Sequence, residues 1–242
     1  MELIFSRDFP IDTVHVDRFG RLKPSMILYF AQEIATDHCA ILGCDWDTMA
    51  EKGLFWAVMR HRIAIHRLPA VGEKIRIETW PMPTTRTCYP RSMAAFDETG
   101  ALLFQVHSLW VLMDIKTRAM VLPGKSGVSV EGVLRGCELP TPASLIPREM
   151  ERKTTRTVCF SDLDRNGHMN NVKYLDWVAD LLPSDFHRDH PPRSISLCYV
   201  SEGREGATLS MNWTQCEDNV LRIEVTDEES GKRIFGGEVV CG

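Results

Sequence analysis

The sequence predicts an α+β protein built from two similar units in tandem, each a helix followed by antiparallel strands. First, VDRFGRLKPSMILYF (16–30) matches LDRNGHMNNVKYLDW (163–177) at an offset of 147 residues. Second, both stretches lead into a helical pattern of apolar residues, and alternating strand-like runs follow each helix. Third, the composition, with 44% apolar and 25% charged residues, is that of a globular protein able to bury a core.

Each half contains one predicted helix, preceded by a strand-like run. In the first half, Pro24 suits the first turn of a helix and Gly43 ends it. In the second half, Asn170 or Asn171 can cap the helix and Pro183 stops it. The apolar residues at helical spacing are Ile27, Phe30, Ala31, Ile34 and Ala35 in the first half, and Val172, Leu175, Val178, Ala179 and Leu182 in the second.

Strand-like runs follow the two helices in the same order. The matching runs are 62–80 with 194–213, and 94–114 with 223–241. The corners DETG and EESG within the later runs predict hairpin turns between alternating strands. Each half is therefore expected to place its helix on an antiparallel sheet.

A segment rich in glycine and proline, 122–150, separates the halves and predicts a linker or crossover. We expect a first unit over residues 1–130, a linker over 131–150 and a second unit over 151–242.

Composition narrows the classes of function. The formal net charge of −5 gives no support to nucleic-acid binding. Eight scattered cysteines without a Cys-x-x-Cys pair favour reduced thiols and a cytoplasmic location. Arg7 and Asp8 come too early for a signal peptide, and no apolar run is long enough for a membrane span. The spacing of potential ligands predicts no metal site, and we expect no cofactor.

The start of the second predicted helix concentrates polar side chains. Asp and Asn are common turn formers and helix caps, so most of these residues, taken alone, would be structural. The positions that repeat between the halves are Asp17, Arg18 and Gly20, which match Asp164, Arg165 and Gly167. By contrast, Asn166 faces Phe19 and His168 faces Arg21. We interpret the repeated positions as scaffold and the unmatched pair as functional.

A glutamate on a later strand shows the same asymmetry. When these strands are aligned through Ile63 and Ile195, the matching pairs are Glu73 with Glu205 and Ala70 with Glu202. The second half is thus polar at three places where the first is inert. We interpret the second half as catalytic and the first as specialised for packing or for enclosing substrate.

The candidate catalytic residues are Asp164, Asn166, His168 and Glu202. A carboxylate can activate water or attack an acyl carbon directly, and an imidazole can move a proton near neutral pH. An Asn amide and the N–H groups at a helix N-terminus can stabilise an oxyanion. Without a nucleophilic serine or a metal site, this set suits hydrolysis of an activated acyl group, a thioester better than an amide.

The stretch SDLDRNGHMNNVKYLDW (161–177) resembles the Asp-x-Asn-x-His-x-Asn-Asn-x-x-Tyr signature of the acyl-acyl-carrier-protein thioesterases of plants and bacteria. WVLMDIKTRAMVLP (110–123) resembles a strand of that family's first domain, and LCYVSEG (197–203) resembles its Glu-bearing strand. The resemblance covers nearly the whole chain and implies two tandem hot-dog units that pair within one molecule. It implies release of free fatty acid from acyl carrier protein, which ends chain elongation. The four candidate residues would act in the second unit, and the first unit would shape the acyl pocket.

The resemblance suggests a mechanism. Glu202, held by His168, would activate water, while Asp164 orients Asn166 and His168. Asn166 and the helix N-terminus around Met169–Asn171 would polarise the thioester carbonyl. A covalent anhydride on Asp164 or Glu202 is the competing route.

One residue departs from the family pattern. Plant members carry a Cys immediately after the catalytic Glu, where this chain has Gly203. If the chain is active, that Cys is not needed for the chemistry. Cys198 is more simply explained as a buried strand residue.

The expected partners are acyl carrier protein and the fatty acyl chain, and a homodimer is left open. Because acyl carrier protein is acidic, the basic segments 148–156 and 60–62 are candidate docking sites, although an ordinary charged surface explains each equally well.

Three alternatives stay open. The first is a hot-dog thioesterase that acts on acyl-CoA, which the sequence does not distinguish. The second is a hot-dog hydratase or dehydratase, against which the added Asn166 and Glu202 argue. The third is a non-catalytic acyl-binding module, which would leave the one-sided polar residues unexplained. The sequence does not specify acyl length or saturation.

Overall fold

The structure is a computed structural model that describes residues 3–216 and 219–242. The chain divides into two compact units. The first unit comprises Met1–Lys23 and Tyr29–Pro142, and the second comprises Pro24–Leu28 and Ala143–Gly242. Each unit combines an antiparallel sheet with a main helix, so the predicted α+β tandem is confirmed.

The sheet of the first unit is antiparallel, with the strand order β1-β3-β4-β5-β2, and β6 pairs with β5 outside this path. Its strands are β1 (Phe5–Pro10), β2 (Leu54–Ile65), β3 (Lys74–Pro81), β4 (Tyr89–Phe96), β5 (Leu102–Asp114) and β6 (Met120–Val121). On β3, Ile75 and Ile77 are fully buried while Lys74 and Arg76 are exposed. This alternation is the period of two that predicted the strand.

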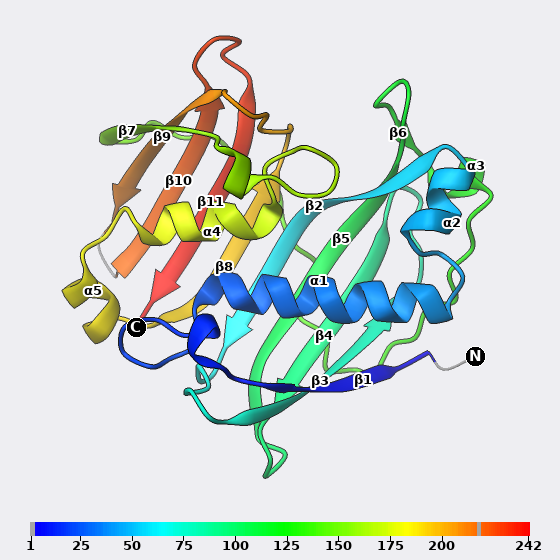
Figure 1. The fold of residues 1–242 in the computed structure, drawn as a ribbon, viewed down its shortest axis with the longest axis horizontal. Helices are drawn as coiled ribbons and strands as arrows, with labels where there is room; N and C mark the ends of the chain where they lie inside the picture. The colour runs from blue at the N-terminus through cyan, green and yellow to red at the C-terminus, as the bar shows by residue number, and fades with distance from the viewer. Residues whose placement is uncertain (1–2, 217–218) are drawn as a thin grey trace. The chain divides into compact units, whose positions relative to one another are not determined.

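Helix α1 (Pro24–Ile41) lies across the strands of the first unit's sheet (Figure 1). Pro24 occupies the first turn, where a missing N–H breaks no intrahelical bond. Ile27, Phe30 and Ile34 point into the core, each at most 1% exposed. Gly43 follows the helix in a left-handed conformation (φ 68°), as expected for a residue that ends a helix. The shorter elements are α2 (Trp46–Glu51), α3 (Pro123–Ser126) and the 3₁₀ turn η1 (Thr13–His15).

The second unit repeats this plan with shorter helices. Its antiparallel sheet has the order β8-β11-β10-β9-β7, and α4 lies across it (Figure 1). A main helix across an antiparallel sheet in both units is the tandem hot-dog arrangement. The elements are β7 (Arg152–Thr157), η2 (Phe160–Asp162), α4 (Asn171–Ala179), α5 (Ser184–Asp189), β8 (Pro192–Tyr199), β9 (Thr208–Gln215), β10 (Val220–Asp227) and β11 (Arg233–Cys241).

Helix α4 ends earlier than the sequence predicts. Asn170 caps its start, because its side-chain oxygen accepts a hydrogen bond from the Val172 N–H at 3.0 Å. The helix stops at Ala179, before Pro183, because the Leu181 and Leu182 N–H groups bond three residues back instead of four. The predicted face is buried at its core positions, and the aromatic residues Tyr174 and Trp177 are buried with it.

Both predicted hairpin turns are confirmed. The β4–β5 turn contains Gly100 (φ 84°) and the β10–β11 turn contains Gly231 (φ 67°), in conformations that favour glycine. In each turn an aspartate accepts hydrogen bonds from the backbone: Asp97 from the Thr99 N–H and Asp227 from the Ser230 N–H. The turn chemistry is therefore the same in the two units.

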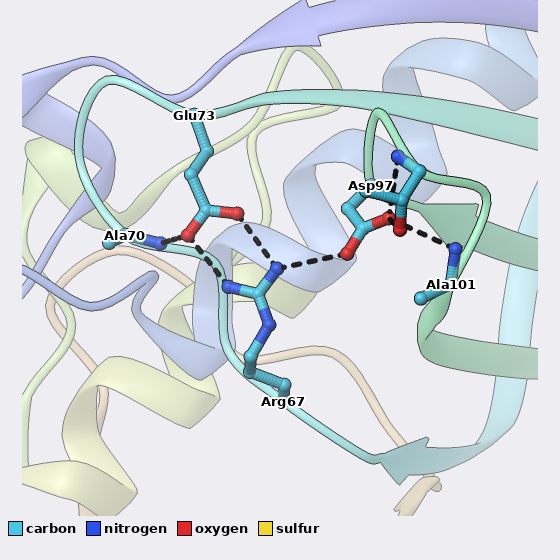
Figure 2. A network of polar contacts seen from close by, with 6 residues as sticks. Arg67, Ala70, Glu73, Asp97 and Ala101 are labelled. Carbon is cyan, nitrogen blue, oxygen red and sulfur yellow. Dashed lines mark hydrogen bonds and ion pairs between the residues drawn. The ribbon is translucent and has the colours of Figure 1, made fainter.

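A polar network fixes the β2–β3 loop of the first unit to the β4–β5 turn (Figure 2). Arg67 donates two hydrogen bonds to Glu73, at 2.6 and 2.8 Å, and one to Asp97 at 3.4 Å. Glu73 also accepts a hydrogen bond from the Ala70 N–H at 2.7 Å. The Arg67 guanidinium lowers the pKa of the Glu73 carboxyl from its ordinary value. Glu73 therefore serves the structure of this loop.

The chain after β6 stays on the first unit. The Trp80 indole N–H donates to Glu138 at 3.1 Å, and the His107 Nδ1 lies 2.8 Å from the Leu139 carbonyl oxygen. Residues as far as Pro142 group with the first unit for this reason.

All eight cysteines are free thiols, and Cys198 is buried on β8. In the part of the chain that the structure describes, no helix has both the length and the apolar character needed to cross a membrane.

Candidate functional site

The polar stretch before α4 forms a tight loop from Asp164 to His168. The Asp164 N–H donates to the His168 carbonyl at 2.8 Å, and the Gly167 N–H donates to the Asp164 carbonyl at 3.0 Å. Gly167 adopts φ 75°, which an L side chain would strain. The loop thus turns the chain back on itself immediately before the helix.

The Asp164 carboxylate holds this loop together. Its Oδ1 accepts hydrogen bonds from the backbone N–H of Asn166 at 2.8 Å and of His168 at 3.3 Å. Its Oδ2 lies 3.5 Å from the Asn166 side-chain nitrogen, at the limit of a hydrogen bond. Asp164 and His168 are half-buried, while Asn166 is exposed.

The first unit contains the same loop. Asp17 Oδ1 accepts hydrogen bonds from the Phe19 N–H at 2.8 Å and the Arg21 N–H at 3.1 Å, and Gly20 has φ 75°. The repeated aspartate and glycine therefore build the loop in both units, as the offset of 147 residues predicts. The backbone-binding part of Asp164's role is structural, since Asp17 performs it as well.

The loop meets the segment that follows β8. The His168 Nε2 lies 3.0 Å from Oε2 of Glu202, with 18% and 34% of the two side chains exposed. The Met169 N–H donates to the Gly203 carbonyl at 2.8 Å, and the backbone of His168 pairs with that of Arg204. Three of the four predicted residues, Asp164, Asn166 and His168, thus share one loop, and Glu202 joins them through His168.

The alignment of the later strands is wrong by two residues. The structure pairs Arg21 with Ala70 in the first unit and His168 with Arg204 in the second, which makes Arg204 the counterpart of Ala70. The left-handed glycines agree: Gly72 (φ 89°) corresponds to Gly206 (φ 79°), at an offset of 134 residues. A slip of two residues keeps every side chain on its face of a strand, so alternation did not reveal it.

The corrected register strengthens the asymmetry between the units. Glu202 now faces Leu68, which is apolar, and Arg204 faces Ala70. The Arg204 guanidinium lies 4.0 Å from the Glu202 carboxylate. Sequence reasoning missed Arg204, although the correct alignment would have marked it as polar in the second half only. Glu73, formerly matched with Glu205, corresponds instead to Ala207.

The N-terminus of α4 offers fewer free donors than expected. The Met169 N–H is bonded to Gly203, and the Asn170 N–H donates to the Asp162 carbonyl at 2.8 Å. For the Asn171 N–H we find no protein acceptor in the described part of the chain. Its counterpart in the sequence repeat is Pro24, at the start of α1, which has no N–H at all. Of these two helix starts, that of α4 therefore presents a backbone donor and that of α1 does not.

The basic segment 148–156 is largely engaged within the second unit. The Arg152 guanidinium lies 4.6 Å from the centre of the Trp213 ring, and Lys153 pairs with Glu228 at 3.0 Å. Arg156 pairs with Asp180, at the C-terminal end of α4. Arg152 and Lys153 stay exposed. In the segment 60–62, by contrast, every residue is buried or half-buried, which argues against that docking site.

Among residues 3–216 and 219–242, no group of three or more His, Cys, Asp or Glu side chains is arranged to hold a metal ion.

Comparison with known families decides the classification. Residues 2–122 match the acyl-ACP thioesterase N-terminal domain, and residues 147–238 match the acyl-ACP thioesterase C-terminal domain. The chain belongs to the acyl-ACP thioesterase family. The two matches cover the two units, and the second includes all four predicted site residues.

Similar proteins and solved structures support this family assignment. The chain is 27% identical over 260 residues to the chloroplastic palmitoyl-acyl carrier protein thioesterase of Gossypium hirsutum, covering 99% of this chain and 63% of that protein. It superimposes on an acyl-ACP thioesterase from Bacteroides thetaiotaomicron with a TM-score of 0.83 and 25% identity, covering 99% and 98% of the two chains. The 12:0-ACP thioesterase from Umbellularia californica shares the fold, with a TM-score of 0.85, 24% identity and coverage of 100% and 98%. This family member spans less than two thirds of the length of the curated relatives that it matches, the Gossypium hirsutum protein included.

Proposed function

We propose that this chain hydrolyses the thioester of fatty acyl-acyl carrier protein and releases the free fatty acid. The relatives named as palmitoyl-acyl carrier protein thioesterase and dodecanoyl-[acyl-carrier-protein] hydrolase support this substrate class. The observation that carries the proposal is the His168–Glu202 contact, because it occurs in one unit only. In the first unit Arg21 turns back to Asp17, at 3.4 Å, and Leu68 replaces the glutamate.

In this proposal Glu202 is the general base. Its carboxylate takes a proton from a water molecule as that water attacks the acyl carbon. His168, 3.0 Å away, holds the carboxylate in place through its imidazole N–H. When the tetrahedral intermediate collapses, the carbon–sulfur bond breaks and Glu202 returns the proton to the leaving sulfur. The Arg204 guanidinium lies 4.0 Å from the same carboxylate.

The oxyanion is stabilised by the Asn166 side-chain amide and the Asn171 N–H. The Asn171 donor lies at a helix N-terminus, where the macrodipole favours negative charge. Asp164 is a positioning residue, since its carboxylate fixes the backbone of Asn166 and His168. The absence of an N–H at Pro24 supports the assignment of this chemistry to the second unit.

Direct attack by water is favoured over an anhydride on Asp164. The Oδ1 of Asp164 already accepts two backbone hydrogen bonds, so an attack by this carboxylate would disrupt the loop. Single turnover in ¹⁸O water separates the two routes. We expect ¹⁸O in the fatty acid alone; ¹⁸O recovered in the side chain of Asp164 or Glu202 would establish the covalent route instead.

The first unit is proposed to enclose the acyl chain, since Phe19, Arg21 and Leu68 stand there in place of Asn166, His168 and Glu202. The proposed function is tested by incubating the protein with acyl-acyl carrier proteins of different chain lengths and measuring free fatty acid. Acyl-CoA thioesters with the same acyl chains are the matched comparison. Faster release from the carrier protein supports the proposal, and faster release from CoA would identify an acyl-CoA thioesterase.

A further inference from the structure

Gly203 directly follows Glu202, and its own backbone conformation does not require a glycine. The residue is buried, and its φ lies outside the left-handed range that favours glycine. A Cβ atom placed on Gly203 would lie 2.9 Å from the Tyr174 hydroxyl oxygen and 3.3 Å from the Cβ of Met169. Such a contact to the tyrosine is closer than real Cβ atoms show, so the hydroxyl occupies the space that a side chain would need.

The Tyr174 ring is held rigidly and cannot easily give way. Tyr174 comes from α4 and is 3% exposed. Its ring stacks on Phe235, with centroids 4.8 Å apart and planes at 20°, and meets Tyr199 edge-on at 5.7 Å. Burial raises the pKa of the Tyr174 hydroxyl above its ordinary value, so the group stays protonated at physiological pH.

The hydroxyl also bonds the segment that follows β8, on which Gly203 lies. The Tyr174 hydroxyl oxygen accepts a hydrogen bond from the Gly203 N–H, and the Gly203 carbonyl accepts a hydrogen bond from the Met169 N–H at 2.8 Å. Residue 203 is thus clamped between α4 and the loop before it. On either side of this clamp stand Glu202, which contacts the His168 imidazole, and Arg204, whose guanidinium lies 4.0 Å from the Glu202 carboxylate.

We propose that Tyr174 is a positioning residue for Glu202: its hydroxyl fixes the Gly203 backbone and so sets the distance between the Glu202 carboxylate and the His168 imidazole. The inference rests on the proposed function of Glu202 as general base.

The test uses three variants of the full chain and one matched control. Tyr174→Phe removes only the hydroxyl, and we expect kcat for acyl-acyl carrier protein to fall by about tenfold with KM changed by less than about twofold. Gly203→Ala forces the segment after β8 away from Tyr174, and we expect a loss of kcat of about tenfold or more. In the double variant Tyr174→Phe/Gly203→Ala the new methyl group has room, so kcat should exceed that of Gly203→Ala.

The control is Tyr89→Phe, which removes a buried tyrosine hydroxyl from the first unit, where it contacts Ser126 at 2.8 Å. A general loss of stability would lower kcat equally in both tyrosine variants, whereas positioning affects Tyr174→Phe alone. Unchanged kcat in Tyr174→Phe, or purely additive effects in the double variant, would overturn the proposal.

Hydrogen exchange of the Gly203 amide separates this inference from the proposed function. We expect exchange to quicken by about tenfold or more in Tyr174→Phe and to stay unchanged in Tyr89→Phe. If the wild-type protein releases no fatty acid, the proposed function fails while the exchange data still decide the clamp. Equal exchange in the wild type and Tyr174→Phe would refute the clamp whatever the activity.

Discussion

The His168 imidazole Nε2 lies 3.0 Å from the Glu202 carboxylate Oε2 and joins two segments of the second unit that the sequence separates. In the first unit these two positions are occupied by Arg21 and Leu68. There, Arg21 bonds back to its own loop and Leu68 stands in place of the glutamate. The internal repeat therefore supplies a comparison within one chain, in which shared contacts are structural and unshared contacts are candidates for chemistry.

Removing the loop aspartates separates structure from catalysis. Asp17→Ala and Asp164→Ala each delete an acceptor of two backbone hydrogen bonds. We expect each to lower the free energy of unfolding by about 1–2 kcal/mol, measured by urea denaturation. Only Asp164→Ala should also lower kcat, because only its loop carries Asn166 and His168. Equal losses of kcat in both variants would show that the effect on turnover is a general one.

The loops and turns were the most predictable parts of the site. Asp164 and Gly167 were identified as scaffold from their match with Asp17 and Gly20, and the two loops have the same hydrogen bonds. The register of Glu202 was not predictable, because sliding a strand by two residues leaves its alternation intact. Arg204 was missed for the same reason. The end of α4 was placed too late, since a proline marks where a helix must have stopped and not where it does stop.

The hydrogen bonds of the site could not be predicted from the sequence. The helix N-terminus was expected to offer donors from Met169 to Asn171, yet two of these N–H groups are bonded to carbonyl groups on neighbouring segments. Tertiary contacts of this kind depend on segments far apart in the chain. The contacts of the Tyr174 hydroxyl are another example. The signature includes this tyrosine but does not indicate which groups its hydroxyl contacts.

Charge reversal tests the proposed docking of acyl carrier protein. Arg152→Glu/Lys153→Glu replaces two exposed cations on β7. We expect a higher KM, by about threefold to tenfold, for acyl-acyl carrier protein but not for a small acyl thioester, because only the carrier is acidic. Lys116→Glu/Lys125→Glu, exposed positions on the first unit, is the control. An equal rise in KM for both thioesters would remove the docking site. Thermal denaturation would show any loss caused by repulsion between Glu228 and the Lys153→Glu side chain.

Acid should destabilise the first unit through His61. This imidazole is buried, with its Nδ1 2.8 Å from the Ser108 hydroxyl, and burial lowers its pKa to about 3. The unfolded chain takes up a proton near pH 6.5, while the folded chain does not do so until about pH 3. The stability contributed by neutral His61 is therefore present above pH 6.5 and is lost as the pH falls, by up to about 1.4 kcal/mol per pH unit.

His61→Gln provides the comparison, since glutamine can keep the bond to Ser108 and does not titrate. Urea denaturation at pH 7.5 and pH 5.5 should show a smaller loss of unfolding free energy in the variant, by about 1 kcal/mol. Equal losses in the two proteins would show that His61 does not stay neutral in the folded state.

Turnover of acyl-acyl carrier protein by Glu202→Ala tests the proposed catalytic site most directly. The measurement is the rate of free fatty acid release, with Glu205→Ala as the matched control and thermal denaturation of each variant. We predict that the wild type and Glu205→Ala release fatty acid at similar rates, and that kcat falls by about a thousandfold in Glu202→Ala without a change in melting temperature. Retained turnover in a folded Glu202→Ala variant would contradict the assignment of this glutamate as the base.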